Sequence, residues 1–87
     1  MPPPKPLPGL GLKSLAMLAA AGIHDLADLE QMGAVKAYLQ VKRAGLPASL
    51  NLLWGLESAL TGQHWQTVAR EERTRLLLTL DAMESNP

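Results

Sequence analysis

A glycine-rich stretch from Leu7 to Ser14 is the part of this chain whose residue types best suit chemistry. Gly9 and Gly11 are two positions apart, and glycine adopts positive φ angles without the steric cost of a Cβ. Lys13 follows at once, at the expected start of a helix. Because the first amides of a helix have no partner within it, they attract an anion. The stretch is therefore typical of a hairpin that holds a phosphate group.

Two interpretations of this hairpin remain open. In the first, the amides of Leu12, Lys13 and Ser14 cradle a nucleic-acid phosphate, with help from the lysine charge and the serine hydroxyl. Such contacts position a protein on a nucleic-acid backbone without reading bases. Lys36 and Arg43 would extend the same basic surface if the hairpin and the third helix lie together. In the second, the hairpin is only a turn that lets helices pack closely.

The overall charge weakens the nucleic-acid interpretation. The chain has 8 basic and 8 acidic residues and a net charge of zero, whereas DNA binding relies on a basic surface. Its aromatic residues are Tyr38, Trp54 and Trp65, too few for the stacking platforms that bind single strands. Contact with a protein, or with DNA inside a larger complex, is favoured.

Catalysis and metal binding find no support in the residue pattern. His24 and His64 lie in expected turns, with no nucleophile and orienting group arranged around them. There is no cysteine. Asp25, Asp28 and Glu30 lack the glycine and the spacing of a calcium loop, and helix capping explains them better. We therefore expect no enzymatic activity, no cofactor, no metal and no small-molecule substrate.

The chain is long enough for one domain. Four prolines in residues 1–6 predict an extended tail, residues 7–84 form the helical domain, and residues 85–87 are expected to fray. No segment has the length of a membrane span or the pattern of a signal peptide, so we expect a cytoplasmic protein. Hydrophobic spacing and turn residues predict five helices, over 12–21, 26–31, 34–44, 50–61 and 67–84.

The helix over 50–61 is apolar almost all round, so it should be central. Ser49 is expected to cap it and Trp65 to fold back onto the core. Lys36, Gln40 and Arg43 are expected to share the outer side of the third helix. The predicted core residues are Leu18, Tyr38, Leu53, Trp54, Leu56, Trp65 and Leu77.

Three segments resemble the C-terminal domain of the TfoX/Sxy competence regulators: LPGLGLKSLAMLAAAGI, HDLADLEQMGAVKAYLQVKRAG and SLNLLWGLESALTGQHW. The resemblance covers about residues 7–84. It implies a bacterial, cytoplasmic, SAM-domain-like protein with a helix-hairpin-helix-type N-terminal hairpin. Relatives promote transcription of DNA-uptake genes together with the cyclic-AMP receptor protein, and they are not known as enzymes. They also carry an N-terminal α/β domain, so this sequence is expected to be a free-standing version or part of a longer protein.

The resemblance carries over by position to Gly9, Gly11, Lys13, Gly33, Tyr38, Ser49, Asn51, Trp54, Gly62 and Trp65. Most of these residue types are expected to be structural. Asn51 is expected to be buried, with its amide bonded to the backbone of the neighbouring loop. Leu12 and Leu15 depart from the pattern, because the family hairpin usually carries proline and a small residue there.

These observations predict an all-α, compact five-helix orthogonal bundle that acts as a non-enzymatic regulatory module in competence. The resemblance implies a transcription factor or RNA polymerase as partner. The alternatives are a DNA-backbone-binding helix-hairpin-helix module and a self-associating SAM-like domain. Protein contact would call for an exposed apolar patch, with Met17 or Leu46 as candidates.

Overall fold

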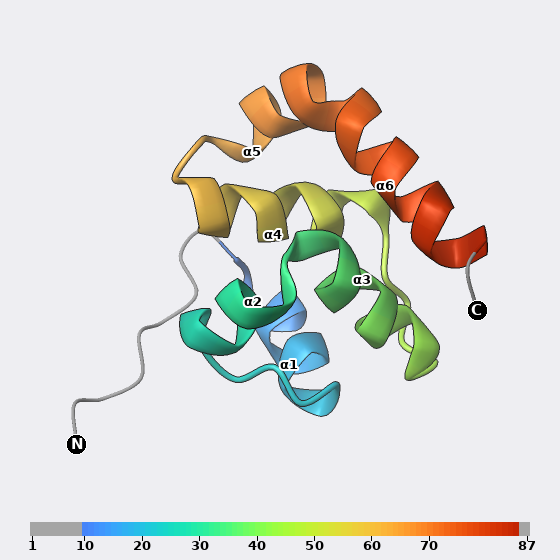
Figure 1. Ribbon diagram of the computed structural model, residues 1–87. Helices are drawn as coiled ribbons and strands as arrows, with labels where there is room; N and C mark the ends of the chain where they lie inside the picture. The colour runs from blue at the N-terminus through green and yellow to red at the C-terminus, as the bar shows by residue number, and fades with distance from the viewer. Residues whose placement is uncertain (1–9, 86–87) are drawn as a thin grey trace.

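The computed structural model describes residues 10–85, which form an all-α fold without a strand among them, as predicted (Figure 1). The helices are α1 (Leu12–Ala20), α2 (Leu26–Met32), α3 (Ala34–Arg43), α4 (Leu50–Thr61), α5 (Trp65–Thr67), the π-helical η1 (Val68–Glu72) and α6 (Arg73–Ser85). The last three are contiguous and count as one rod, which gives five. The predictions for Gly9, the proline-rich tail and residues 86–87 lie outside the described residues.

Helix α1 ends in the glycine turn that the sequence predicts. Gly22 has a φ of 88°, a left-handed conformation that glycine adopts without strain. Its amide donates to the carbonyl of Ala19 at 3.0 Å, and the amide of Ile23 donates to the carbonyl of Leu18 at 2.8 Å. This is a Schellman-type end, and it turns the Ile23 side chain into the core.

Helix α2 begins at the predicted cap. The Asp25 carboxylate accepts a hydrogen bond from the amide of Asp28 at 2.9 Å, and the Asp28 carboxylate accepts one from the amide of His24 at 3.0 Å. The first bond satisfies an amide that the helix leaves free, and the second ties the residue before the cap to the first turn. The acidic cluster is thus engaged in starting α2, as the sequence predicts.

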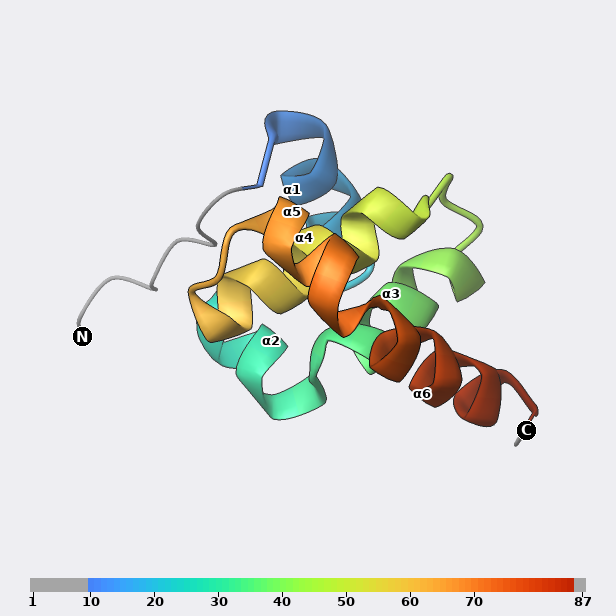
Figure 2. The same cartoon turned by 90° about the horizontal axis from the view of Figure 1, so that it is seen from above.

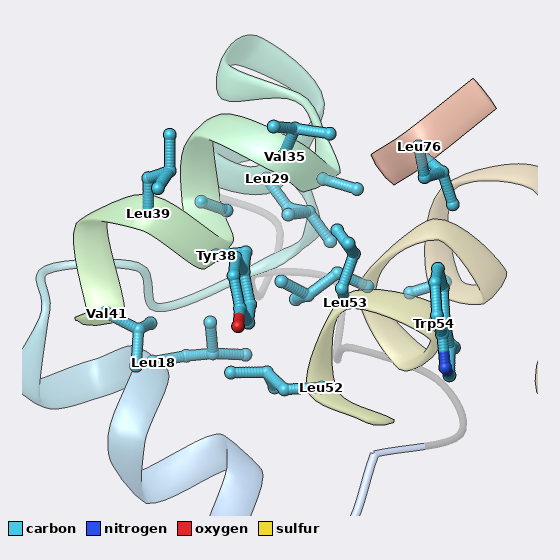
Figure 3. Close-up of a cluster of buried hydrophobic side chains, with 14 of the residues drawn as sticks. Leu18, Leu29, Val35, Tyr38, Leu39, Val41, Leu52, Leu53, Trp54 and Leu76 are labelled. Carbon is cyan, nitrogen blue, oxygen red and sulfur yellow. The ribbon is translucent and has the colours of Figure 1, made fainter. Parts of the chain in front are cut away.

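Helix α4 lies in the centre of the fold and packs against α2, α3 and the α5–η1 segment (Figures 1 and 2). Its buried side chains include Leu53 and Trp54. In Figure 3 Leu53 lies on the side of Tyr38 and Leu29, and Trp54 lies on the other side, below Leu76. A helix that is apolar on most sides must be covered on most sides, and here three helices and the π-helical segment cover it. Leu18, Tyr38, Leu53, Trp54 and Leu56 are all buried.

The final rod begins two residues earlier than predicted. His64 Nδ1 accepts a hydrogen bond from the amide of Gln66 at 3.2 Å, so this side chain caps the helix at Trp65. Within the rod, Val68 and Leu76 are both buried, although residues eight apart in a regular α-helix lie about 80° from each other. The wider π-helical turn between them reduces that angle.

The early start corrects the prediction for Trp65. Its side chain is 43% exposed, because it occupies the first helical position beside solvent and stacks on His64 with ring centroids 5.9 Å apart. Leu77 is half-buried at the edge of the core. The apolar stripe that reaches the core therefore consists of Val68, Leu76 and Leu80.

Three polar predictions are also corrected. Ser49 precedes α4 but makes no capping bond with its side chain, and Asn51 is exposed rather than buried. Gln40 does not belong to an outer face with Lys36 and Arg43, because its Nε2 donates to the carbonyl of Ala21 at 2.6 Å. That bond ties α3 to the end of α1.

Candidate functional site

Three of the predicted phosphate-binding residues, Gly11, Lys13 and Ser14, line an open cleft of about 320 Å³ between the starts of α1 and α4. We call it the α1–α4 cleft. Its lining residues come from the chain entering α1, from the loop and first turns of α4, and from the start of α5: Leu10, Gly11, Lys13, Ser14, Met17, Pro47, Ser49, Asn51, Leu52, Gly55 and Trp65. The hairpin residues thus form one wall only, and α4 supplies the other.

The start of α1 differs from the predicted hairpin in its backbone. Gly11 has φ −74° and ψ 167°, an extended conformation open to any residue, so the positive φ predicted for it is wrong. The first turn is closed by the amide of Leu15, which donates to the carbonyl of Gly11 at 3.0 Å. No side chain caps the amides of Lys13 and Ser14 from the N-cap position, which leaves this helix start open to solvent or to a ligand.

Close packing between the chain before α1 and helix α4 fixes the shape of the cleft. A Cβ placed on Gly55 would lie 2.8 Å from Cδ2 of Leu10. The absence of a side chain at Gly55 therefore lets Leu10 rest on α4, and α1 begins two residues later. A glycine inside a helix costs about 1 kcal/mol of helix stability relative to alanine, and here it makes room for this contact.

The cleft combines positive potential with apolar surface. The starts of two helices line it, and each carries the positive end of a helix dipole. Lys13 adds a full charge, and no carboxylate among the described residues lines the cleft. Beside it, Trp65 is partly exposed and Leu12, between two lining residues, is 87% exposed. The arrangement suits an anionic group next to an apolar one, either a DNA phosphate or a carboxylate of a protein.

The structure does not bring Lys36 and Arg43 to this cleft. Both line a different hollow between α3 and α6, and the two hollows share no lining residue. In Figure 2 the start of α1 lies at the top of the molecule and the C-terminal part of α6 lies at the lower right. The basic face that the sequence predicts from the hairpin and the third helix is therefore divided between two surfaces.

Two of the remaining cations, Arg75 and Lys42, pair with acids. Arg75 donates from Nε to Glu72 at 2.7 Å and from Nη2 to Glu57 at 3.3 Å. The hydrogen bond that Arg75 donates to Glu72, with the charge of Glu57, raises the pKa of Arg75, so it stays protonated. Lys42 Nζ lies 3.8 Å from Glu84 Oε1. Arg70 and Arg73, which line neither hollow, form no ion pair within residues 10–85.

The histidines lie apart from each other, in two exposed turns on α2 and α5. Within residues 10–85, no three His, Asp or Glu side chains gather in a way that could hold a metal ion. None of the helices in that range is long and apolar enough to cross a membrane.

Sequence reasoning missed the second wall of the cleft. Asn51 and Ser49 were assigned to burial and capping, and Trp65 to the core, whereas all three line the cleft. The pairing of an asparagine in the first turn of an apolar helix with a tryptophan just after that helix was the available signal. The predicted patch residues Met17 and Leu46 are half-buried, and the more exposed large apolar side chains are Leu12, Leu50, Trp65, Leu78 and Met83.

Comparison with known proteins gives a clear family assignment. A family model described as the TfoX C-terminal domain matches residues 5–80. The chain is also 35% identical over 77 residues to the DNA transformation protein TfoX of Haemophilus influenzae (strain ATCC 51907 / DSM 11121 / KW20 / Rd). The aligned region is 88% of this chain and 36% of that relative, so the chain spans well under half of the relative's length. No solved structure matches.

Proposed function

Because this chain belongs to the TfoX C-terminal domain family, we propose that it is a regulatory module for DNA transformation that works by contacting a protein. Its role is to help switch on transcription of genes for DNA uptake, and its direct partner is a transcription factor or RNA polymerase. The contact surface is the α1–α4 cleft. No chemical step is assigned to the domain.

The single observation that carries this proposal is the exposed apolar surface at the cleft. Trp65 is 43% exposed and Leu12 is 87% exposed in a domain whose other tryptophan, Trp54, is buried. Tryptophan is enriched among the residues that carry most of the energy of protein–protein contacts. Exposed apolar groups ringed by polar residues such as Asn51 and Ser14 favour a protein interface.

The charge distribution supports a protein over a DNA partner. The chain is neutral overall, and among residues 10–85 Lys13 is the only cationic residue in the lining of the cleft. DNA-binding surfaces gain affinity by neutralising several phosphates, which a single lysine does not do. A carboxylate on a protein partner needs only one such counter-charge.

A second candidate function is contact with a DNA backbone at the same place. The observation in its favour is the start of α1, where Gly11 offers no side chain to the free amides of Lys13 and Ser14. A phosphate bound there would be held by backbone amides, without reading of bases. This contact would operate within a larger complex, since one phosphate supplies little affinity.

A chimera of the Haemophilus influenzae relative tests the proposed function. We would replace the matched 36% of that protein with this chain, in a strain whose own gene is inactive. We expect transformation frequency to recover to within about tenfold of the wild type, a loss of about 1.4 kcal/mol if it reflects partner affinity alone. A control chimera carries an unrelated helical domain of equal length. If the first chimera accumulates normally and transforms no better than the control, the proposal is wrong.

A further inference from the structure

A second hollow, separate from the α1–α4 cleft, runs between α3 and α6. We call it the α3–α6 groove. It has a volume of about 500 Å³ and is lined by Lys36, Leu39, Arg43, Thr79, Ala82 and Met83. A smaller hollow of about 270 Å³ continues it toward Val35 and Leu76, and the two share Lys36, Thr79 and Met83. Together they follow much of the length of α3.

The floor of the groove is apolar and incompletely covered. Leu39 is buried in α3, Ala82 comes from α6, and Met83 of α6 is 38% exposed. The last turns of α6 extend outward in both ribbon views (Figures 1 and 2), and Ala82 and Met83 in these turns line the hollow beside α3. Methionine adapts its shape to different apolar neighbours, which suits a surface that receives a partner.

The rim of the groove is basic. Lys36 and Arg43 are exposed and stand seven residues apart on α3, which is about two helical turns or roughly 10 Å. Within residues 10–85 neither forms an ion pair, and no carboxylate lines the 500 Å³ hollow. At its outer end, Lys42 is engaged by Glu84. The groove therefore presents two free cations above an apolar floor.

We propose that the α3–α6 groove docks an acidic amphipathic helix of a partner protein. The apolar face of that helix covers Leu39 and Met83, and carboxylates two turns apart on its edge pair with Lys36 and Arg43. Helix α3 is about 15 Å long, so a partner helix of three turns spans it. Helix-in-groove recognition uses apolar anchors at such spacing, and the complementary charges fix its register and speed association.

A second copy of this chain is a poorer occupant. Helix α2 carries exposed Glu30, but it turns Leu29 into its own core. Helix α6 carries Asp81 and the exposed Leu78, but it already forms one wall of the groove. The chain as a whole is neutral, whereas the basic rim of the groove is complementary to an acidic partner.

Selection from a random library of displayed peptides, each about four helical turns or 15 residues long, tests the proposal on the full chain. We expect enriched peptides to carry apolar residues at i, i+3, i+4 and i+7 with Asp or Glu on the flanks. In NMR titrations these peptides should shift the signals of Leu39, Thr79 and Met83. Enriched peptides without acids, shifts confined to the α1–α4 cleft, or no enrichment would each overturn the proposal.

Charge reversal supplies the matched control. Lys36→Glu with Arg43→Glu should weaken binding of the best acidic peptide at least about tenfold, because it turns both attractions into repulsions. Arg70→Glu with Arg73→Glu makes the same change in net charge at two exposed residues that line neither hollow. It should alter the affinity less than about twofold, since screened charges at a distance contribute little.

Two further results would refute an acidic partner helix. One is an equal loss of affinity in both variant pairs, which would mean that the peptide responds to net charge alone. The other is a concentration-dependent dimer in sedimentation velocity whose formation shifts the NMR signals of the groove residues. That result would mean that a second copy of the chain occupies the groove. The chimera assay is independent of both results, so this inference and the proposed function can fail separately.

Discussion

Replacing Leu53 by alanine should lower the free energy of unfolding by about 3 kcal/mol, because it empties a fully buried site in the central helix. A domain of this size has a total stability of about 4–13 kcal/mol. The loss is therefore a large fraction of the whole, and the midpoint of thermal unfolding should fall by roughly 15 °C. Urea unfolding followed by circular dichroism measures the loss of free energy, and a thermal scan of the same signal measures the fall in the thermal midpoint.

Leu78→Ala is the matched control for this substitution. It removes the same side chain from α6, where Leu78 is 66% exposed, and it should cost less than about 0.5 kcal/mol. If both variants lose similar stability, α4 is not the centre of the core and the packing in Figure 3 is wrong.

The second large effect is expected at Trp65. In the chimera described above, Trp65→Ala should lower transformation frequency more than about tenfold, since truncation of an interface tryptophan costs about 2 kcal/mol or more of binding energy. The effect on folding should be smaller, because nearly half of the side chain is already in solvent. A urea unfolding curve of the isolated variant separates the two effects.

Leu78→Ala again serves as the control, because it removes an exposed apolar side chain that belongs to neither hollow. It should transform like the unaltered chimera. If Trp65→Ala also transforms like the unaltered chimera, the α1–α4 cleft is not the contact surface. The exposed apolar surface at the cleft would then no longer support the proposed function.

The parts of this fold that depend on local chemistry were predictable from the sequence. Gly22 and Gly62 end α1 and α4 with φ angles of 88° and 78°, and Asp25 caps α2 as its residue type favours. The hydrophobic spacing of α3 and α4 identified Tyr38, Leu53 and Trp54 as buried. Each of these features is determined within a few residues along the chain.

Features that depend on contacts between distant segments were not predictable. The spacing of Gln40 in α3 predicts a surface residue, but its side chain donates to the carbonyl of Ala21, which is distant in the sequence. Trp65 looks like a core residue until His64 caps the last rod and turns it outward. The separation of Lys13 from Lys36 and Arg43 depends on how α1 packs against α3. No local pattern encodes such relations.

The choice between a protein and a DNA partner rests on one place, the start of α1. Adding duplex DNA at low ionic strength to isotope-labelled protein, and following the backbone amides of Leu12, Lys13 and Ser14 by NMR, decides it. We expect these signals to keep their chemical shifts, because the chain is neutral and residues 10–85 place one lysine in the cleft, which releases too few counterions to bind DNA. Shift changes at these amides that disappear on adding salt, and in Lys13→Glu, would contradict a protein partner and assign the cleft to a DNA phosphate.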